Sequence, residues 1–282
     1  MDSGKSLALN GAASEGDGMK FCFAAFAAVS ALISVLASGC ASLTLSQVQR
    51  LTVLTYNIHH GEGVDGKLDL ERIARLISRE NPDLVALQEV DQNTQRTGGV
   101  DQAKELARLT GMHFAFGSAM DYQGGDYGQA ILSRWPIQHH SVHILPQRDG
   151  REPRICLAVQ LKSPVPDLTF ASTHLDHQVE AIRIQQAQEL NKIFAERNPA
   201  ILAGDFNAVL SSETMQSLLA EWSDSAGTNS APTIPAAKPA RRIDYILTRP
   251  ESRWRMITSR VVDEPVASDH LPVLAVLELK TK

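Results

Sequence analysis

The chain has 282 residues, of which 43% are hydrophobic, and a formal net charge of −5. This length and composition are sufficient for one sizeable α/β domain. The acidic balance, with no long Lys/Arg run, disfavours a dedicated nucleic-acid binder, which usually carries a basic face. Cys22, Cys40 and Cys156 do not have the spacing of a zinc motif. We expect Cys156, in an apolar segment, to be a small core residue.

The N-terminal region has the order of a secretory signal. Lys20 precedes an apolar, uncharged run over residues 21–38, and small residues follow before Cys40. The run barely reaches the roughly 18–20 residues that span a bilayer, and no basic cluster follows it. Its end, Leu36 to Cys40, resembles a bacterial lipobox, in which the cysteine thiol accepts diacylglycerol and the peptide is cut before that cysteine. Ordinary secretion and an uncleaved anchor are the alternatives.

These features predict a cleaved and lipidated protein. We expect residues 1–39 to be a signal peptide with a polar N-terminal extension, residues 40–49 a linker, and residues 50–282 the functional domain. Cys40 is then the lipid anchor and the protein belongs to the cell envelope. Cys40 is followed by Ala and Ser, without the Asp that marks inner-membrane retention in lipoproteins, which favours the outer membrane or the periplasmic side.

The domain alternates helix-like and strand-like segments in chain order. Apolar residues at helical spacing predict helices over 70–79, 101–109, 178–196 and 212–220, the first with Asp69 as N-cap and the second with Gly111 as its stop. Apolar and β-branched runs predict strands over 51–58, 83–90, 129–133, 139–145, 154–162, 168–174, 200–203, 243–247, 253–262 and 271–279. Residues 223–240 are expected to form a loop. Adjacent strands are too frequent for a simple βαβ repeat, so two packed sheets flanked by helices fit better.

Polar residues collect at the ends of the apolar strands. The residues in question are Asn57, Glu89, His174, Asp205, Asn207, Asp244, Asp269 and His270. Any one of them is ordinary, because strand ends meet polar loops. Together they supply carboxylates, amides and imidazoles, which suit a hard divalent cation and the activation of water.

The order of these motifs resembles the endonuclease/exonuclease/phosphatase superfamily, and particularly its deoxyribonuclease-like, metal-dependent phosphoesterases. The matching segments are YNI at 56–58, LQEV at 87–90, ILSR at 131–134, STHL at 172–175, GDFN at 204–207, RIDY at 242–245 and SDH at 268–270. They extend over nearly all of the expected domain. The resemblance implies a four-layer α/β sandwich, with two packed, mainly antiparallel or mixed sheets flanked by helices and the site at one end.

The resemblance also implies ligands for Mg²⁺ or Mn²⁺. Glu89 is the expected carboxylate ligand, because Mg²⁺ binds few protein groups and prefers oxygen. Asn57 is expected to hold the metal shell or a phosphate oxygen. Asp269 is a second candidate ligand, directly or through water. Arg151, in an Arg-Glu-Pro segment that the deoxyribonucleases share, is expected to approach phosphate.

The remaining residues are candidates for proton transfer. His270 is expected to act as base with Asp244 orienting it, since a carboxylate fixes the tautomer of an imidazole and raises its basicity. Asp205 is the alternative base, and Asn207 a donor to phosphate. His174 is expected to be a general acid or a phosphate donor. Some relatives have an acid two residues after the first asparagine, where this chain has His59, so a second-metal role there is not expected.

The sequence thus predicts a monomeric, metal-dependent phosphodiesterase or phosphatase acting outside the cytoplasm on an unidentified phosphoester. An extracytoplasmic endonuclease is the first alternative, although the net charge does not favour nucleic acid. A non-catalytic lipoprotein that binds phosphorylated ligands is the second. We expect the loops around residues 91–127 and 223–240 to set specificity.

Overall fold

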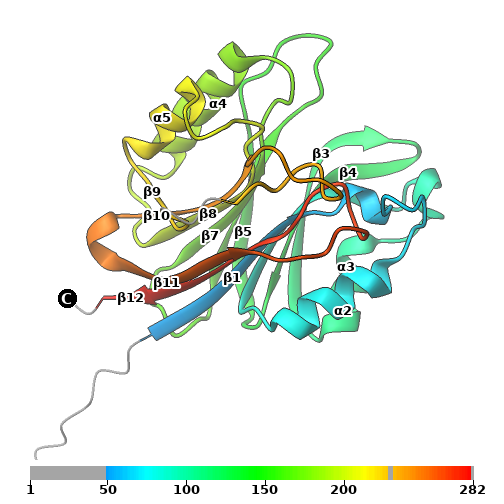
Figure 1. Cartoon of the computed structure of the whole chain (residues 1–282), viewed down its shortest axis with the longest axis horizontal. Helices are drawn as coiled ribbons and strands as arrows, with labels where there is room; N and C mark the ends of the chain where they lie inside the picture. Colours follow the sequence, from blue (N-terminus) through cyan, green and yellow to red (C-terminus); the bar gives the residue numbers. More distant parts are fainter. Residues whose placement is uncertain (1–48, 228–230, 281–282) are drawn as a thin grey trace, which may run out of the picture. The chain divides into compact units, whose positions relative to one another are not determined.

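Two six-stranded sheets form the centre of the molecule, seen in a computed structural model that describes residues 49–227 and 231–280 (Figure 1). The expectations for residues 1–48, including Cys22 and Cys40, lie outside the described residues. The first sheet has the order β11 (Trp254–Val261), β12 (Val273–Leu279), β1 (Gln49–Asn57), β2 (Leu84–Gln92), β4 (Gly125–Ser133) and β3 (His113–Tyr122). The second has the order β5 (Ile137–Ile144), β6 (Ile155–Leu161), β7 (Thr169–His174), β8 (Ala200–Asp205), β10 (Asp244–Arg249) and β9 (Ser223–Asp224).

Each sheet contains one parallel pair in its middle, and the other strand pairs are antiparallel. In the first sheet β1 pairs parallel with β2, and in the second β7 pairs parallel with β8. A helix connects each parallel pair: α2 (Leu70–Glu80) follows β1 and α4 (Glu180–Ile193) follows β7. The carboxyl ends of parallel strands lie at the same edge of a sheet, so each pair delivers its terminal side chains to one place.

Helices cover the outer face of each sheet. α2 and α3 (Gln102–Thr110) pack on the first sheet, and α4 and α5 (Glu213–Leu219) on the second (Figure 1). The helix ends follow local chemistry: the side chains of Asp69, Asp101 and Ser212 each accept a hydrogen bond from a backbone N–H three residues later. α3 ends at Gly111, whose φ of 69° is the left-handed conformation that glycine adopts at low cost.

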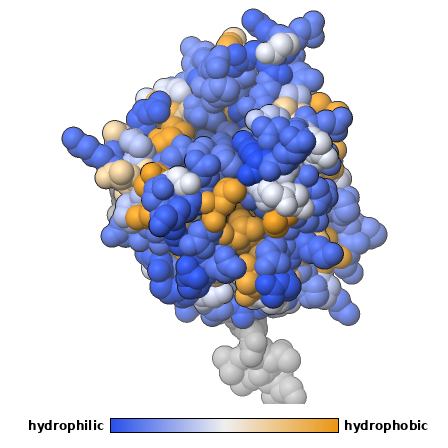
Figure 2. All heavy atoms as spheres, turned by 90° about the vertical axis from the view of Figure 1, so that its right-hand side faces the viewer, coloured by the Kyte–Doolittle hydropathy of each residue, from blue (hydrophilic) through white to orange (hydrophobic). Residues whose placement is uncertain are grey.

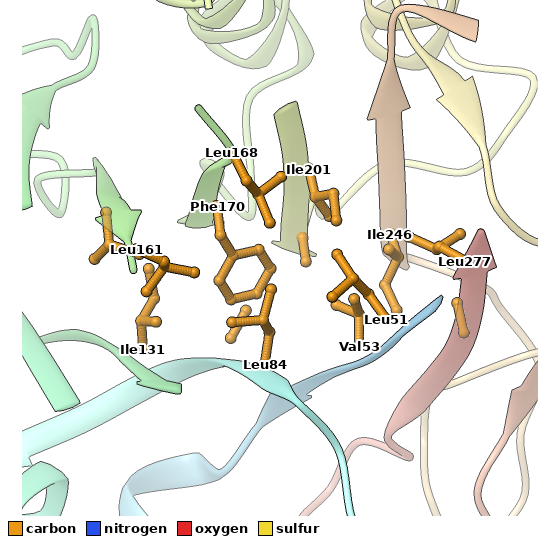
Figure 3. Close-up of a cluster of buried hydrophobic side chains, with 14 of the residues drawn as sticks. Leu51, Val53, Leu84, Ile131, Leu161, Leu168, Phe170, Ile201, Ile246 and Leu277 are labelled. Carbon is orange, nitrogen blue, oxygen red and sulfur yellow. The ribbon is translucent and has the colours of Figure 1, made fainter. Parts of the chain in front are cut away.

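The core has three apolar layers. The central one lies between the sheets, where Leu84 and Val53 of the first sheet face Phe170 and Ile201 of the second (Figure 3). The outer layers lie between each sheet and its helices. Cys156 is fully buried in one of the outer layers, as expected of a core residue. Helix, sheet, sheet and helix therefore form the four-layer α/β sandwich that the sequence resemblance implies.

Most of the predicted elements are present, and the main difference is a hairpin. Residues 113–122, for which no element was predicted, form β3, and β4 begins at Gly125 rather than residue 129. Gln123 and Gly124, both at positive φ, make the two-residue turn between them. α4 is shorter than predicted. The segment 223–240, predicted to be a loop, begins with the short strand β9.

The surface of the described residues is largely hydrophilic. On the face in Figure 2, hydrophobic side chains gather near the middle of an otherwise hydrophilic surface. Among the described residues, no helix has both the length and the apolar character needed to cross a bilayer. Scattered exposed hydrophobic residues are normal on folded proteins.

Candidate active site

The two parallel strand pairs bring four of the predicted residues together. Asn57 ends β1 beside Gln88 of β2, and His174 ends β7 directly beside Asp205, which ends β8. Asn57 Nδ2 donates to Glu89 Oε1 at 2.9 Å and lies 3.2 Å from Asp205 Oδ2. One amide group therefore joins the polar strand ends of both sheets.

Glu89 reaches this position because β2 contains a β-bulge. The pairing of β2 with β4 shifts register between Gln88 and Val90, and Glu89 has a φ of 57°. A bulge leaves one residue outside the ladder and re-aims its side chain, and left-handed φ costs energy for a residue other than glycine. Gln88, the residue before Glu89, donates from Nε2 to Ser172 Oγ of the second sheet at 3.0 Å, and this hydrogen bond fixes the two sheets relative to each other at the site.

Asp205 is the centre of the hydrogen-bond network. Its Oδ1 accepts from the backbone N–H of Asn207 at 2.9 Å, and its Oδ2 lies 3.3 Å from His174 Nε2 and 3.7 Å from His270 Nε2. The carboxylate is buried. Burial raises its pKa, His270 opposes this, Asp244 adds to it, and the resulting pKa is about 7. Asp205 can therefore exchange a proton near neutral pH.

His270 and Asp244 form a buried pair beside Asp205. The distance from His270 Nδ1 to Asp244 Oδ2 is 3.0 Å. Burial alone would lower the pKa of His270, but the carboxylates of Asp244 and Asp205 outweigh it and raise the pKa to about 10. His270 therefore carries a positive charge near neutral pH.

His174 has the opposite electrostatic environment. Arg154 Nη1 donates to His174 Nδ1 at 2.9 Å, which requires the single proton of the neutral ring to be on Nε2. Burial is the largest cause that holds the pKa of His174 well below its usual value, followed by the charge of Arg154. The acceptor nearest to this N–H is Asp205 Oδ2, 3.3 Å from Nε2, whereas the Asn207 amide N–H donates to the carbonyl oxygen of Leu175 at 3.1 Å. His174 thus presents a neutral N–H donor.

These groups line one pocket of about 390 Å³. Its walls are formed by His59, His60, Glu89, Arg96, Met120, Tyr122, Tyr127, Glu152, Arg154, His174, His177, Asp205, Asn207 and His270. Asn57 and Asp244 lie directly behind these walls through the contacts above. The pocket is therefore where the two sheets deliver their polar strand ends.

Besides Asn57 and Asp244, two other predicted residues, Arg151 and Asp269, do not line this pocket. The guanidinium of Arg151 pairs with Asp176, with Nη2 3.0 Å from Oδ1, and also contacts Gln178. The carboxylate of Asp269 accepts from Ser268 Oγ at 3.3 Å and does not line the pocket walls. The phosphate contact expected of Arg151 and the metal contact expected of Asp269, directly or through water, stay predictions, because neither side chain lines the pocket.

Arg154 and Arg96 line the pocket, although no role was predicted for either from the sequence. Arg154 is buried and holds both His174 and His177 through their Nδ1 atoms. The available signal was a charged residue at the start of an otherwise apolar strand. Arg96 pairs with Asp91 at 2.6 Å and lies over the ring of Tyr122 at 4.7 Å. Nothing in the sequence around Arg96 distinguished it from an ordinary loop residue.

The donor set around Glu89 fits a divalent cation. Within residues 49–227 and 231–280, no Lys or Arg lies within ion-pair distance of the Glu89 carboxylate, although it is only partly exposed. A ring nitrogen from each of His59 and His60 lies within 4.8 Å of a Glu89 carboxylate oxygen and of the other. A carboxylate without a cationic partner, facing a pocket with further donors, is a suitable ligand for a metal ion.

Comparisons with known proteins agree with this geometry. The chain is 27% identical to the uncharacterized protein YbhP of Escherichia coli K12 over 246 residues, which is 80% of this chain and 96% of that protein. A solved endonuclease/exonuclease/phosphatase from Beutenbergia cavernae is 27% identical with a TM-score of 0.70, covering 82% of this chain and 72% of that one. A mannosyl-6-phosphatase from Bacteroides thetaiotaomicron has the same fold, at 21% identity and a TM-score of 0.66, covering 82% of this chain and 100% of that one. The model of the endonuclease/exonuclease/phosphatase family matches residues 54–270, most of the chain, and this chain belongs to that family.

Proposed function

We propose that this protein is a phosphoester hydrolase, a phosphodiesterase or phosphatase, that uses Mg²⁺ or Mn²⁺. The observation that carries the proposal is the convergence, in one pocket, of the Glu89 carboxylate with no cationic partner and the buried array of Asp205, His270 and His174. A bound divalent cation would offset charge on the phosphoryl oxygens and lower the pKa of water. Glu89 would hold it, with Asn57 fixing the orientation of that carboxylate.

The protein's own groups divide the remaining work. Asp205 accepts the proton of the attacking water, because its pKa of about 7 is matched to neutral pH. His270, charged and held by Asp244, stabilises the negative charge that develops beside it. His174 and Asn207 donate hydrogen bonds to non-bridging oxygens. This assigns the base to Asp205, whereas the sequence alone left Asp205 and His270 as alternatives.

The pocket favours a small or terminal phosphoester. Its volume of about 390 Å³ is at the lower end of the range for small-molecule sites. Arg154 lines the pocket and contacts His174, and Arg96 lines it over the ring of Tyr122. The fold shared with a mannosyl-6-phosphatase supports a sugar phosphate among the substrates to be tested. The acidic net charge supports a small substrate over nucleic acid.

We further propose that the enzyme is a monomer anchored by a lipid on Cys40, on the periplasmic side of the cell envelope or in the outer membrane. The lipobox-like segment that ends at Cys40 supports this placement. A signal peptide over residues 1–39 and a linker over residues 40–49 would place the hydrolase domain, residues 50–282, outside the cytoplasm.

The test is a panel of substrates with one inactive variant as background. Sugar phosphates, phospholipids, nucleotides, bis-nitrophenyl phosphate and DNA are incubated with Mg²⁺ or Mn²⁺, using wild-type protein and Asp205→Asn. We expect small esters to be cleaved by the wild type only. Cleavage of DNA in preference to all small esters would favour the endonuclease, and cleavage of nothing would favour a binding protein.

A further inference from the structure

The sequence predicted no metal role for the loop after β1, but the structure places a ring nitrogen of each of two of its histidines within 4.8 Å of Glu89. His59 and His60 have φ values of 46° and 45°, so two consecutive residues other than glycine adopt the left-handed conformation. Glu89, at 57°, does the same. Such conformations cost energy and persist where the surrounding structure imposes them, frequently at functional sites. The loop and the bulge are thus held in costly conformations that bring two imidazoles and one carboxylate together.

His59 has its ring held by the loop itself. Its Nδ1 lies 3.1 Å from the backbone carbonyl oxygen of Glu62, which can only accept, so Nδ1 carries the proton. Its backbone N–H donates to Asn57 Oδ1 at 3.1 Å, which ties the loop to the amide that also contacts Glu89. The lone pair is therefore on Nε2. A histidine that donates one ring N–H to a backbone carbonyl is the usual arrangement of a metal ligand.

His60 is buried yet has a polar atom without a partner. The residue is 9% exposed, and within the described residues its Nδ1 is buried with no hydrogen-bond partner. The other ring nitrogen, Nε2, lies 3.5 Å from Glu62 Oε2. Gln102 donates to the His60 carbonyl, which anchors the backbone. Buried polar atoms are rarely left without a partner, and one ring nitrogen of His60 lies within 4.8 Å of a Glu89 carboxylate oxygen.

We propose that His59, His60 and Glu89 together bind a first-row transition-metal ion, and that this nitrogen-containing set selects such an ion over Mg²⁺. Imidazole suits transition metals, with affinity rising from Mn²⁺ to Co²⁺ to Ni²⁺, whereas Mg²⁺ prefers oxygen and retains its water. The proposal rests on the proposed function in sharing Glu89 with the hydrolytic site. It adds two ring nitrogens to the oxygen ligands expected from the sequence, and of the two ions in the proposed function it favours Mn²⁺ over Mg²⁺.

The experiment measures binding and not activity. Tag-free protein is stripped with EDTA, and Co²⁺ and Mg²⁺ affinities are measured by calorimetry, with the visible absorption of bound Co²⁺ recorded in parallel. The variants are His59→Ala, at a partly exposed position, and His60→Asn, with folding checked by circular dichroism. The matched control is His139→Ala with His140→Ala, an adjacent histidine pair that is exposed on β5 and lies outside the pocket.

We expect each site variant to weaken Co²⁺ binding at least about tenfold and to change its absorption, since even second-shell partners contribute about 10–100-fold. Mg²⁺ affinity should stay close to that of the wild type, and the control pair should behave as wild type. Wild-type Co²⁺ affinity in a folded His59→Ala protein would overturn the proposal. If Co²⁺ binding did not depend on the histidines but the protein hydrolysed an ester with Mg²⁺, the metal-site proposal would fail and the proposed function would hold. If Co²⁺ binding depended on the histidines but no ester was hydrolysed, the proposed function would fail and the metal site would hold.

Discussion

Replacing His174 tests whether this residue donates a hydrogen bond or a proton. Arg154 donates to Nδ1 at 2.9 Å, and burial holds the pKa of the ring well below its usual value, so His174 is neutral at pH 7. A neutral ring has no spare proton for a leaving group, but its Nε2–H remains a donor for a phosphoryl oxygen. Removing one such donor costs roughly 10²–10³ in kcat, or about 3–4 kcal/mol. His174→Ala should therefore lose kcat in that range.

The assay compares two leaving groups. An alkyl phosphodiester needs its leaving oxygen protonated, whereas a nitrophenyl ester needs this far less. For a hydrogen-bond donor, His174→Ala should lose the same factor on both esters, and His113→Ala, on an exposed position of β3, should lose nothing. If the loss on the alkyl ester exceeded that on the nitrophenyl ester by about 10²-fold or more, His174 would be a general acid and the reasoning from its pKa would be refuted.

Three other predictions concern stability and processing. Folding raises the pKa of His270 from 6.5 to about 10. Its contribution to the free energy of unfolding is therefore fully present below pH 6.5 and is lost as the pH rises toward 10. Urea unfolding of metal-free protein should therefore show a smaller loss of stability over that range for Asp244→Asn than for wild type, and equal losses would contradict the pairing. Phe170→Ala, in the fully buried layer between the sheets, should lower the free energy of unfolding by about 3–5 kcal/mol in urea titrations, and a cost below about 1 kcal/mol would argue against that core. Cys40→Ser should abolish lipid labelling and the processing of the precursor. An unmodified Cys40 in the mature protein, found by mass spectrometry, would contradict the predicted lipid anchor.

Much of the fold was readable from the sequence because local signals agreed with tertiary structure. Helix caps such as Asp69 and Gly111 and the apolar strands lie where they were predicted. β3 was not predicted because its sequence mixes apolar residues with Gly117, Ser118 and Asp121, and it owes its conformation to its long pairing with β4. Pairing of this kind depends on a partner strand and leaves a weak local signal.

The sequence predicted which strand ends form the candidate site, but not the direction in which each side chain points. Asp269 and His270 lie in a bend before β12, where no regular alternation of side chains applies, and only His270 lines the pocket. In the loop before β6, Arg154 contacts His174 and His177, whereas Arg151 pairs with Asp176. The bulge that aims Glu89 and the left-handed turn at His59 depend on backbone conformations for which residue type is a poor guide.

The most direct test of a metal-dependent hydrolase is hydrolysis of a small phosphoester by EDTA-stripped protein before and after Mg²⁺ or Mn²⁺ is returned. We expect no turnover by the stripped wild type, recovery when metal is added, and no recovery in Glu89→Gln, which keeps the side-chain volume but loses the carboxylate. Asp263→Asn, which removes an exposed carboxylate outside the pocket, should recover as the wild type does. Full turnover in rigorously metal-free protein, or full recovery of Glu89→Gln, would contradict the account.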